Sequence, residues 1–284
     1  MRHTQYLPIG AALLSIISLQ TGAALAKTAF STIGPEGMSA LRVGIAAIIL
    51  CCFTKPWRIR CNRSELVNIL FFGVTLGLMN LFIYMAFKYM PVGIAISMEV
   101  IGPLAVTLLS SRQPKDLISI LFAVTGLTLL PIGGNNTSIE LLGVVYVGAS
   151  ALFWGLYVSS GSKIASFGSQ GFSLGLIVAS MFIVPLGINS GVIEKINTDV
   201  FAIGCTIAIM STALPLVLDS FALKYVPKSI FGVLMSASPA VSALAGMVIL
   251  DELLTLYQWV GIFLISLACM GATMNFKSNV VATN

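Results

Sequence analysis

Two charged residues lie well inside long apolar segments, where ionisable side chains are rare. Glu99 lies within the segment 96–103, and Arg42 lies within the segment 38–44. A charge at membrane depth costs about 2.5 kcal/mol or more on insertion scales, so both residues are candidates for binding a substrate or a proton. Asp219 and Lys27 lie nearer the ends of their segments and are weaker candidates, because each side chain could snorkel to the interface.

Three prolines are expected to break the helices that carry such residues. Pro103 follows Glu99 by four positions, and a proline removes the hydrogen bond to the carbonyl four residues before it. Pro215 acts in the same way on Ser211, and Pro239 creates a third break. Broken helices near mid-membrane are typical of transporter sites, although prolines also kink membrane helices without such a role. We predict that the three breaks line a cavity.

The chemistry of Glu99 and Arg42 has two interpretations that remain open. In one, they form a buried ion pair that only fixes helix packing. In the other, Glu99 binds the ammonium group of a zwitterion, and Arg42 binds its carboxylate, whose geometry matches the guanidinium. Glu99 is also a candidate proton carrier during transport, since a buried carboxyl group can exist in either protonation state.

Aromatic, cysteine and histidine residues add little chemistry. Trp154 and Tyr157 could line the cavity, but aromatic residues at helical spacing more often pack against neighbouring helices. The five cysteines show no C-x-x-C spacing, and the single histidine, His3, lies in the N-terminal tail. There is no G-x-x-x-x-G-K-[ST] pattern for ATP hydrolysis. We therefore predict no cofactor, no metal site and no enzymatic activity.

The composition predicts the elements that must position these residues. Apolar residues make up 57% of the 284 residues and charged residues 9%, with a mean hydropathy of +1.00. No soluble fold of this size buries so much apolar surface. Apolar runs of about 20 residues are typical of membrane helices and too long for barrel strands. We predict an all-α membrane protein with ten spans, at 7–26, 36–54, 66–86, 91–110, 115–132, 140–160, 170–190, 200–221, 228–249 and 255–275.

An internal repeat divides these ten helices into two sets of five. The segment 86–91 recurs as 222–227, and at the same shift of 136 residues Pro103 meets Pro239. We predict repeats at 1–134 and 135–284. Because five is odd, the second repeat starts on the opposite side of the membrane. Such inverted repeats support alternating access around a central site.

Lysine and arginine in the loops predict the orientation. One side carries eleven of these residues, namely Arg2, Lys55, Arg58, Arg60, Arg63, Arg112, Lys115, Lys163, Lys224, Lys228 and Lys277. The other side carries Lys27, Lys88 and Lys195. Both termini are therefore predicted to be cytoplasmic, and the basic composition indicates topology, not nucleic-acid binding.

A signal-peptide-like pattern, with Ala24-Leu25-Ala26 before Lys27, is present at the N-terminus. We expect this segment to be retained, because Lys27 matches Lys163 in the repeat.

Several short motifs resemble the drug/metabolite transporter superfamily of EamA type. They are residues 22–27, 40–42, 55–58, 91–95, 102–106 and 211–215, and together they extend over nearly the whole chain. Within this family the chain is most similar to bacterial inner-membrane exporters of threonine and homoserine. The resemblance implies a ten-helix basket with a central cavity, proton-driven export, and functional roles for Lys27, Arg42 and Glu99. At Asp219 the family pattern leads us to expect a longer acid.

The resulting expectation is a secondary transporter that exports a small zwitterionic amino acid, with the proton as coupling ion and the lipid bilayer as its surroundings. One alternative is a uniporter or importer of another small metabolite in the same superfamily. Another is a membrane scaffold subunit that does not transport, although a scaffold gains little from buried charge. An enzyme that acts on lipid is a further alternative, which the lack of catalytic histidine disfavours.

Overall fold

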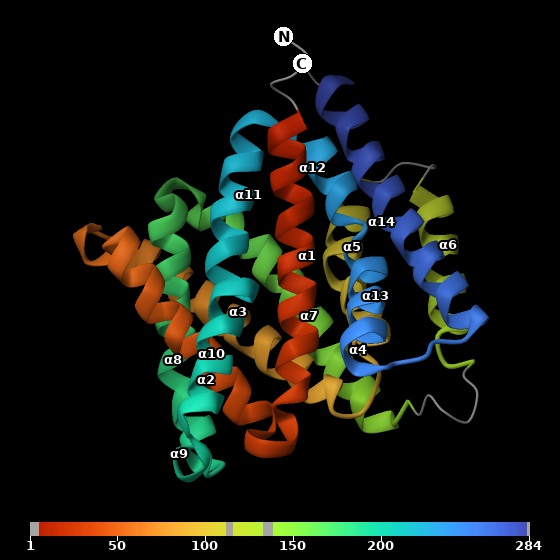
Figure 1. The fold of residues 1–284 in the computed structure, drawn as a ribbon. Coiled ribbons are helices and arrows are strands. Elements are labelled where there is room, and N and C mark those ends of the chain that lie inside the picture. Colours follow the sequence, from red (N-terminus) through yellow and green to blue (C-terminus); the bar gives the residue numbers. More distant parts are fainter. Residues whose placement is uncertain (1–5, 112–115, 133–138, 283–284) are drawn as a thin grey trace.

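The computed structural model describes residues 6–111, 116–132 and 139–282 and builds them into a helical bundle (Figure 1). Within this part of the chain, nine helical segments are long and apolar enough to cross a membrane. They are α1 (Tyr6–Thr28), α2 (Phe30–Thr54), α3 (Arg63–Phe87), α4 with α5 (Val92–Glu99 and Ile101–Ser111), α7 (Leu141–Ile164), α8 (Gly168–Asn189), α10 with η3 and α11 (Thr198–Ala208, Ile209–Ala213 and Leu214–Tyr225), α12 with α13 (Lys228–Met235 and Ser238–Leu250) and α14 (Leu256–Ala282). The all-helical membrane architecture is thereby confirmed.

The tenth predicted span, 115–132, corresponds to the shorter apolar helix α6 (Asp116–Leu129). With 14 residues it is about 21 Å long, against a hydrocarbon core of about 30 Å. The count of ten spans therefore stays a prediction. The predicted boundary between the repeats, at residues 134 and 135, lies outside the described residues, as do Arg112 and Lys115 of the charge argument.

Local sequence explains where several helices begin and bend. At the start of α3, the Asn62 side chain accepts from the Glu65 N–H at 2.9 Å, and the Glu65 carboxylate accepts from the Asn62 N–H at 2.8 Å. This capping box satisfies two backbone donors that a helix start leaves unpaired. Within α2, Gly34 adopts φ 70°, a left-handed conformation that glycine tolerates, directly before Pro35. The chain therefore kinks there before it enters the segment that carries Arg42.

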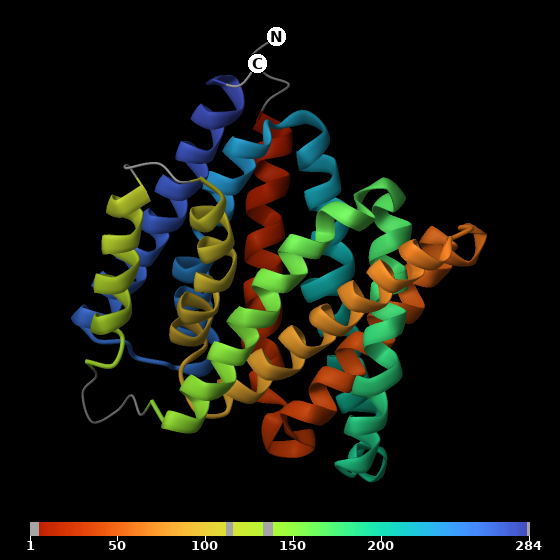
Figure 2. The same ribbon diagram turned by 180° about the vertical axis from the view of Figure 1, so that it is seen from behind.

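The breaks expected at the prolines are present. α4 ends at Glu99 and α5 begins at Ile101, two residues before Pro103. The equivalent break separates α12 from α13 next to Pro239, and the π-helical turn η3 ends just before Pro215. The bounds of α4 and α12 differ by the 136 residues of the sequence repeat. In Figures 1 and 2, α4–α5 and α12–α13 run in opposite directions along the bundle, as do α1 and α7.

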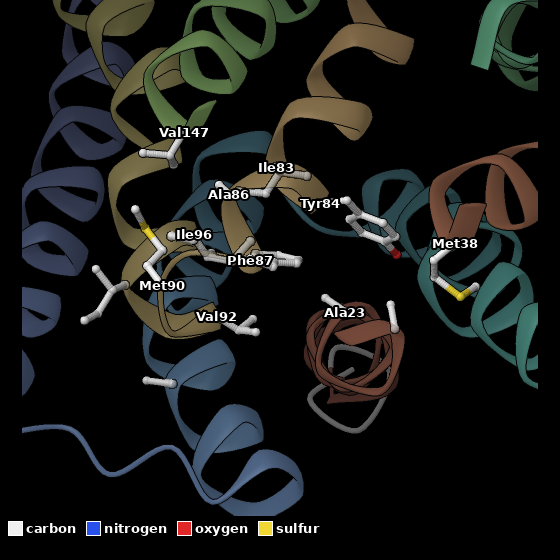
Figure 3. Packing of buried hydrophobic residues seen from close by; sticks show 14 of the residues in the cluster. Ala23, Met38, Ile83, Tyr84, Ala86, Phe87, Met90, Val92, Ile96 and Val147 are labelled. Carbon is white, nitrogen blue, oxygen red and sulfur yellow. The ribbon is translucent and has the colours of Figure 1, made fainter. Parts of the chain in front are cut away.

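The α1 helix lies in the middle of the bundle, between α11 on one side and α13 on the other (Figure 1). Seen from behind, α3 and α7 cross in front of it and pack extensively against each other (Figure 2). The largest core cluster forms where these helices meet, and Figure 3 shows Ala23 of α1, Met38 of α2 and Tyr84 and Phe87 of α3 within it. The two candidate charges lie on helices that surround this centre.

Candidate functional site

Arg42 of α2 occupies a position opposite the broken helix at Pro215. Its Nη2 donates to the carbonyl oxygen of Ser211 at 3.2 Å, and its Nε donates to Thr212 Oγ1 at 3.4 Å. The Ser211 carbonyl is the one that Pro215 deprives of its helical donor. Arg42 therefore caps a backbone group that the proline exposes, while its Cζ lies 5.2 Å from the centre of the Tyr84 ring in a cation–π contact.

Hydroxyl groups near Arg42 are buried and lack hydrogen-bond partners. They are Ser39 Oγ, Tyr84 Oη and Ser211 Oγ, each on a residue no more than 3% exposed. In Figure 3 the Tyr84 hydroxyl points into the space between α1 and α2. Buried polar groups are nearly always paired, so unpaired ones indicate a place where a ligand or water completes the bonding.

The helix α1 holds the broken segment in place on its other side. Ser18 Oγ donates to the Met210 carbonyl at 2.8 Å, and Ser15 Oγ approaches the Pro215 carbonyl at 3.5 Å. Gly22 allows this close approach, because a Cβ there would overlap Ser211 Oγ. The exposed carbonyls of η3 are thus satisfied by α1 and α2 together.

Asp219 lies one helical turn beyond Pro215 on α11. Ser15 is within hydrogen-bonding reach of its carboxylate, whereas Asp219 Oδ1 is buried and has no partner. The side chain is half-buried and forms no ion pair among the described residues. Asp219 therefore belongs to the same helix break as Arg42 without contacting it.

Glu99 lies at the other break, at the end of α4, and is 5% exposed. Its Oε1 makes a short hydrogen bond with Ser150 Oγ of α7, and Ser150 Oγ also lies 2.9 Å from the Met79 carbonyl of α3. A serine hydroxyl has one hydrogen to donate. A separate two-centre hydrogen bond to each oxygen would require a proton on the Glu99 carboxyl group, donated to Ser150.

The close packing of α5 on α7 brings Glu99 to Ser150. Gly102 lies against Ala151 so closely that a Cβ at position 102 would overlap the Ala151 carbonyl oxygen. Close helix contact in membranes depends on such small residues. Gly102 belongs to a motif of the sequence resemblance, and its packing fixes the distance between the break at Pro103 and α7.

Glu99 and Arg42 do not form a direct ion pair. Among the described residues neither side chain takes part in a salt bridge, although the two charges interact electrostatically across the interior. The simple ion-pair interpretation of the sequence is therefore not what the structure contains. Two opposite charges are held apart, and each retains hydrogen-bonding capacity.

Lys27 takes part in a different contact, at the end of the bundle opposite to the start of α1 (Figure 1). Its Nζ lies 2.7 Å from Glu252 Oε1 and donates to the Met90 carbonyl at 2.9 Å. Glu252 Oε2 in turn accepts the Val92 N–H, at the N-terminus of α4, at 2.9 Å. The Lys27–Glu252 contact thus connects α1, the start of α4 and the α13–α14 connection.

Removing this contact is expected to destabilise this end of the bundle. Charge-assisted hydrogen bonds contribute about 1.5–3 kcal/mol each, and the two side chains are largely shielded, with 22% and 13% exposure. Glu252→Gln should therefore lower the melting temperature of the detergent-purified protein. The charge-swapped double variant Lys27→Glu with Glu252→Lys should recover part of the loss. An unchanged melting temperature in Glu252→Gln would contradict a structural role of the pair.

The two aromatic candidates lie in different core clusters. Trp154 packs against the cluster that contains Tyr84, whereas Tyr157 packs in the cluster around Phe72, with ring centres 4.7 Å apart. The structure thus does not bring them together. Separately, an apolar groove of about 570 Å³ between α2 and α8, which includes Gly44 and Val184, contains none of the candidate residues.

Several residues of the site were not identified from the sequence. Ser150 and Tyr84 carry no local signal, since a single serine or tyrosine in an apolar helix is ordinary. Ser211 was identified only through the carbonyl that Pro215 exposes. Glu252 was not a candidate either, because an acidic residue between two apolar segments is ordinary. In each case the functional position depends on which helices become neighbours.

Apolar spanning helices, three broken helices and interior charged residues that do not form an ion pair define a multi-pass membrane transport protein. The comparison with known families agrees, since the EamA-like transporter family matches residues 141–274. The chain belongs to this family. It is an inner-membrane exporter-type transport protein and not an enzyme.

Two named relatives cover nearly the whole chain. The threonine/homoserine exporter RhtA of Escherichia coli (strain K12) is 38% identical over 274 residues, which is 96% of this chain and 93% of that protein. The threonine/homoserine exporter RhtA of Salmonella typhimurium (strain LT2) is 37% identical with the same coverage. One crystal structure of a protein at 16% identity superimposes with a TM-score of 0.60, covering 95% of this chain and 98% of that chain, which shows the shared fold.

Proposed function

We propose that this protein exports small zwitterionic amino acids, such as threonine and homoserine, across the inner membrane in exchange for protons. The observation that carries the proposal is that the interior residues Arg42 and Glu99 do not form a salt bridge with each other. A zwitterion supplies the two missing partners in one molecule. The names of the relatives, which are threonine/homoserine exporters, support this substrate class.

In this proposal Arg42 binds the substrate carboxylate. Its Nε and Nη2 are held by Thr212 and the Ser211 carbonyl at the helix break, which orients the planar group. The guanidinium carries five donors, so hydrogens remain for a carboxylate. The Tyr84 ring beneath it limits the approach to one face.

Glu99 binds either the substrate ammonium group or a proton. In the proton-loaded state the carboxyl group donates to Ser150, and Ser150 donates to the Met79 carbonyl. When the proton leaves, Ser150 has one hydrogen for two acceptors, so the carboxylate gains the capacity to accept an ammonium hydrogen. Proton and substrate thus compete for one oxygen, which is the basis of exchange between them.

Alternating access would follow from two inverted five-helix repeats that together form ten spans, with both termini cytoplasmic. The matching bounds of α4 and α12 and their opposite directions support this arrangement. The Lys27–Glu252 contact lies at the end predicted to face outward. We infer that it closes this end and opens for release, and that Lys27 acts as a gate residue.

The test is uptake of labelled threonine by inside-out vesicles with an acidic interior. Export in the cell appears here as uptake, and the proton gradient should drive accumulation that collapses when a protonophore is added. Vesicles without the protein provide the control. Equal uptake by both vesicle preparations would reject threonine as a substrate, whereas uptake insensitive to the protonophore would reject proton coupling.

A further inference from the structure

The hydroxyl groups beside Arg42 have no function in binding the charged ends of a substrate. Ser39, Tyr84 and Ser211 come from α2, α3 and η3, so they approach from three different elements. Ser39 lies one turn before Arg42 on the same helix, the Tyr84 ring lies under the guanidinium, and the Ser211 carbonyl accepts from it. The three residues therefore lie on elements that carry or contact Arg42, and the Ser211 hydroxyl itself faces Gly22 of α1.

Several other buried hydroxyls bond within their own helices, although Ser266 Oγ of α14 also lacks a partner. Ser97 donates to the Gly93 carbonyl of its own helix at 2.6 Å, Thr75 to the Phe72 carbonyl at 2.9 Å, and Ser242 to the Pro239 carbonyl at 2.8 Å. This local bonding is the usual way for serine and threonine to be buried in a helix. The three hydroxyls beside Arg42 depart from this pattern, so their burial is unfavourable until something pairs with them.

We propose that Ser39, Tyr84 and Ser211 form a subsite that recognises the side-chain hydroxyl of the amino acid. This inference rests on the proposed function, because it requires that Arg42 binds the substrate carboxylate. With the carboxylate held there, the side chain of a small amino acid reaches only the immediate surroundings of the guanidinium. These surroundings contain neutral hydroxyl groups that can both donate and accept hydrogen bonds. A hydroxyl on the substrate is the group that can likewise accept from one of them and donate to another.

The arrangement also explains tolerance for two positions of the substrate hydroxyl. Threonine carries it one carbon from the α-carbon, and homoserine carries it two carbons away. Three hydroxyl groups that can rotate, on three separate elements, can form a hydrogen bond with the substrate hydroxyl in either position without movement of the backbone. An apolar side chain of the same size, such as that of valine, would leave all three groups unpaired, and sites of this kind reject such analogues strongly.

The experiment measures competition by threonine, homoserine and valine against labelled threonine, for the full-length protein in vesicles. For the unmodified protein we expect threonine to compete at least about 100-fold better than valine, since valine is isosteric but lacks the hydroxyl. Tyr84→Phe, Ser39→Ala and Ser211→Ala should each reduce this preference about 5–10-fold, the equivalent of one lost hydrogen bond. Affinity for valine should stay constant or rise.

Thr75→Val provides the matched control, because it removes an equally buried hydroxyl that bonds to its own helix. It should leave the preference unchanged. If one of the single variants fails to fold, the other two and the binding of threonine and valine to purified protein test the proposal. An equal loss for threonine and valine, or an unchanged ratio in all three single variants, would overturn the subsite. Failure of the unmodified protein to take up threonine or homoserine would instead reject the proposed function.

Discussion

Replacing Glu99 by glutamine is expected to abolish proton-driven accumulation of threonine in inside-out vesicles. Glutamine keeps the size of the side chain and an oxygen that can accept from Ser150, but it carries neither a charge nor an exchangeable proton. Loss of one member of a buried charged interaction costs about 2–5 kcal/mol. An effect of this size lowers the initial rate by about 30-fold or more.

The same variant distinguishes the two functions proposed for Glu99. If the carboxylate carries the proton, Glu99→Gln should still exchange labelled for unlabelled threonine across the membrane without a gradient. If the carboxylate binds the ammonium group, exchange and accumulation should both be lost. Glu140→Gln, at the exposed start of α7, is the control for the loss of one carboxylate. Normal gradient-driven accumulation by Glu99→Gln would contradict both functions.

Replacing Arg42 is expected to have an effect of similar size, but the conservative replacement by lysine should change the KM for threonine. Arg42→Lys keeps the positive charge but loses the planar arrangement of donors that contacts Thr212, the Ser211 carbonyl and a carboxylate together. Its KM for threonine should rise about tenfold or more, since charge-assisted hydrogen bonds contribute about 1.5–3 kcal/mol each. Arg42→Gln, which has no charge, should show no measurable uptake.

Two further variants make this prediction specific to the site. Arg60→Gln removes an exposed arginine from the α2–α3 connection and should leave uptake unchanged. The double variant Glu99→Gln with Arg42→Gln should lose stability by about the sum of the single losses, to within about 0.5 kcal/mol, because the two side chains do not touch. Mutual rescue of stability would restore the ion-pair interpretation. A KM for Arg42→Lys equal to that of the unmodified protein would remove Arg42 from the substrate site.

Much of the architecture could be predicted from the amino-acid sequence alone. Apolar runs of about 20 residues form α-helices in lipid, because the backbone must satisfy its own hydrogen bonds there. The same holds for the breaks, since Pro103 and Pro239 cannot donate to the preceding turn wherever the helix lies. The span predicted at 115–132 corresponds to α6, whose 14 residues show that hydropathy locates an apolar segment better than it gives the length of the helix.

The partners of each charged side chain could not be predicted, because they depend on packing between helices far apart in the sequence. An ion pair was one of two open interpretations of Glu99 and Arg42. In the structure Glu99 bonds to Ser150, 51 residues away, and Arg42 bonds to Ser211, 169 residues away. Lys27 looked free to reach the interface, but Glu252 lies beside it in the folded chain. Such contacts leave no periodic pattern in either segment.

The features that the sequence determines differ from those that the tertiary structure decides, and the difference has a physical reason. The apolar spans, the proline breaks and the charges within the spans follow from interactions of a segment with lipid or with its own backbone, so the amino-acid sequence determines them by itself. The choice of partners follows from side-chain packing across helix interfaces, where one glycine such as Gly102 sets how closely two backbones approach. Only the tertiary structure therefore decided that the two interior charges stand apart, and that three unpaired hydroxyls gather beside one of them.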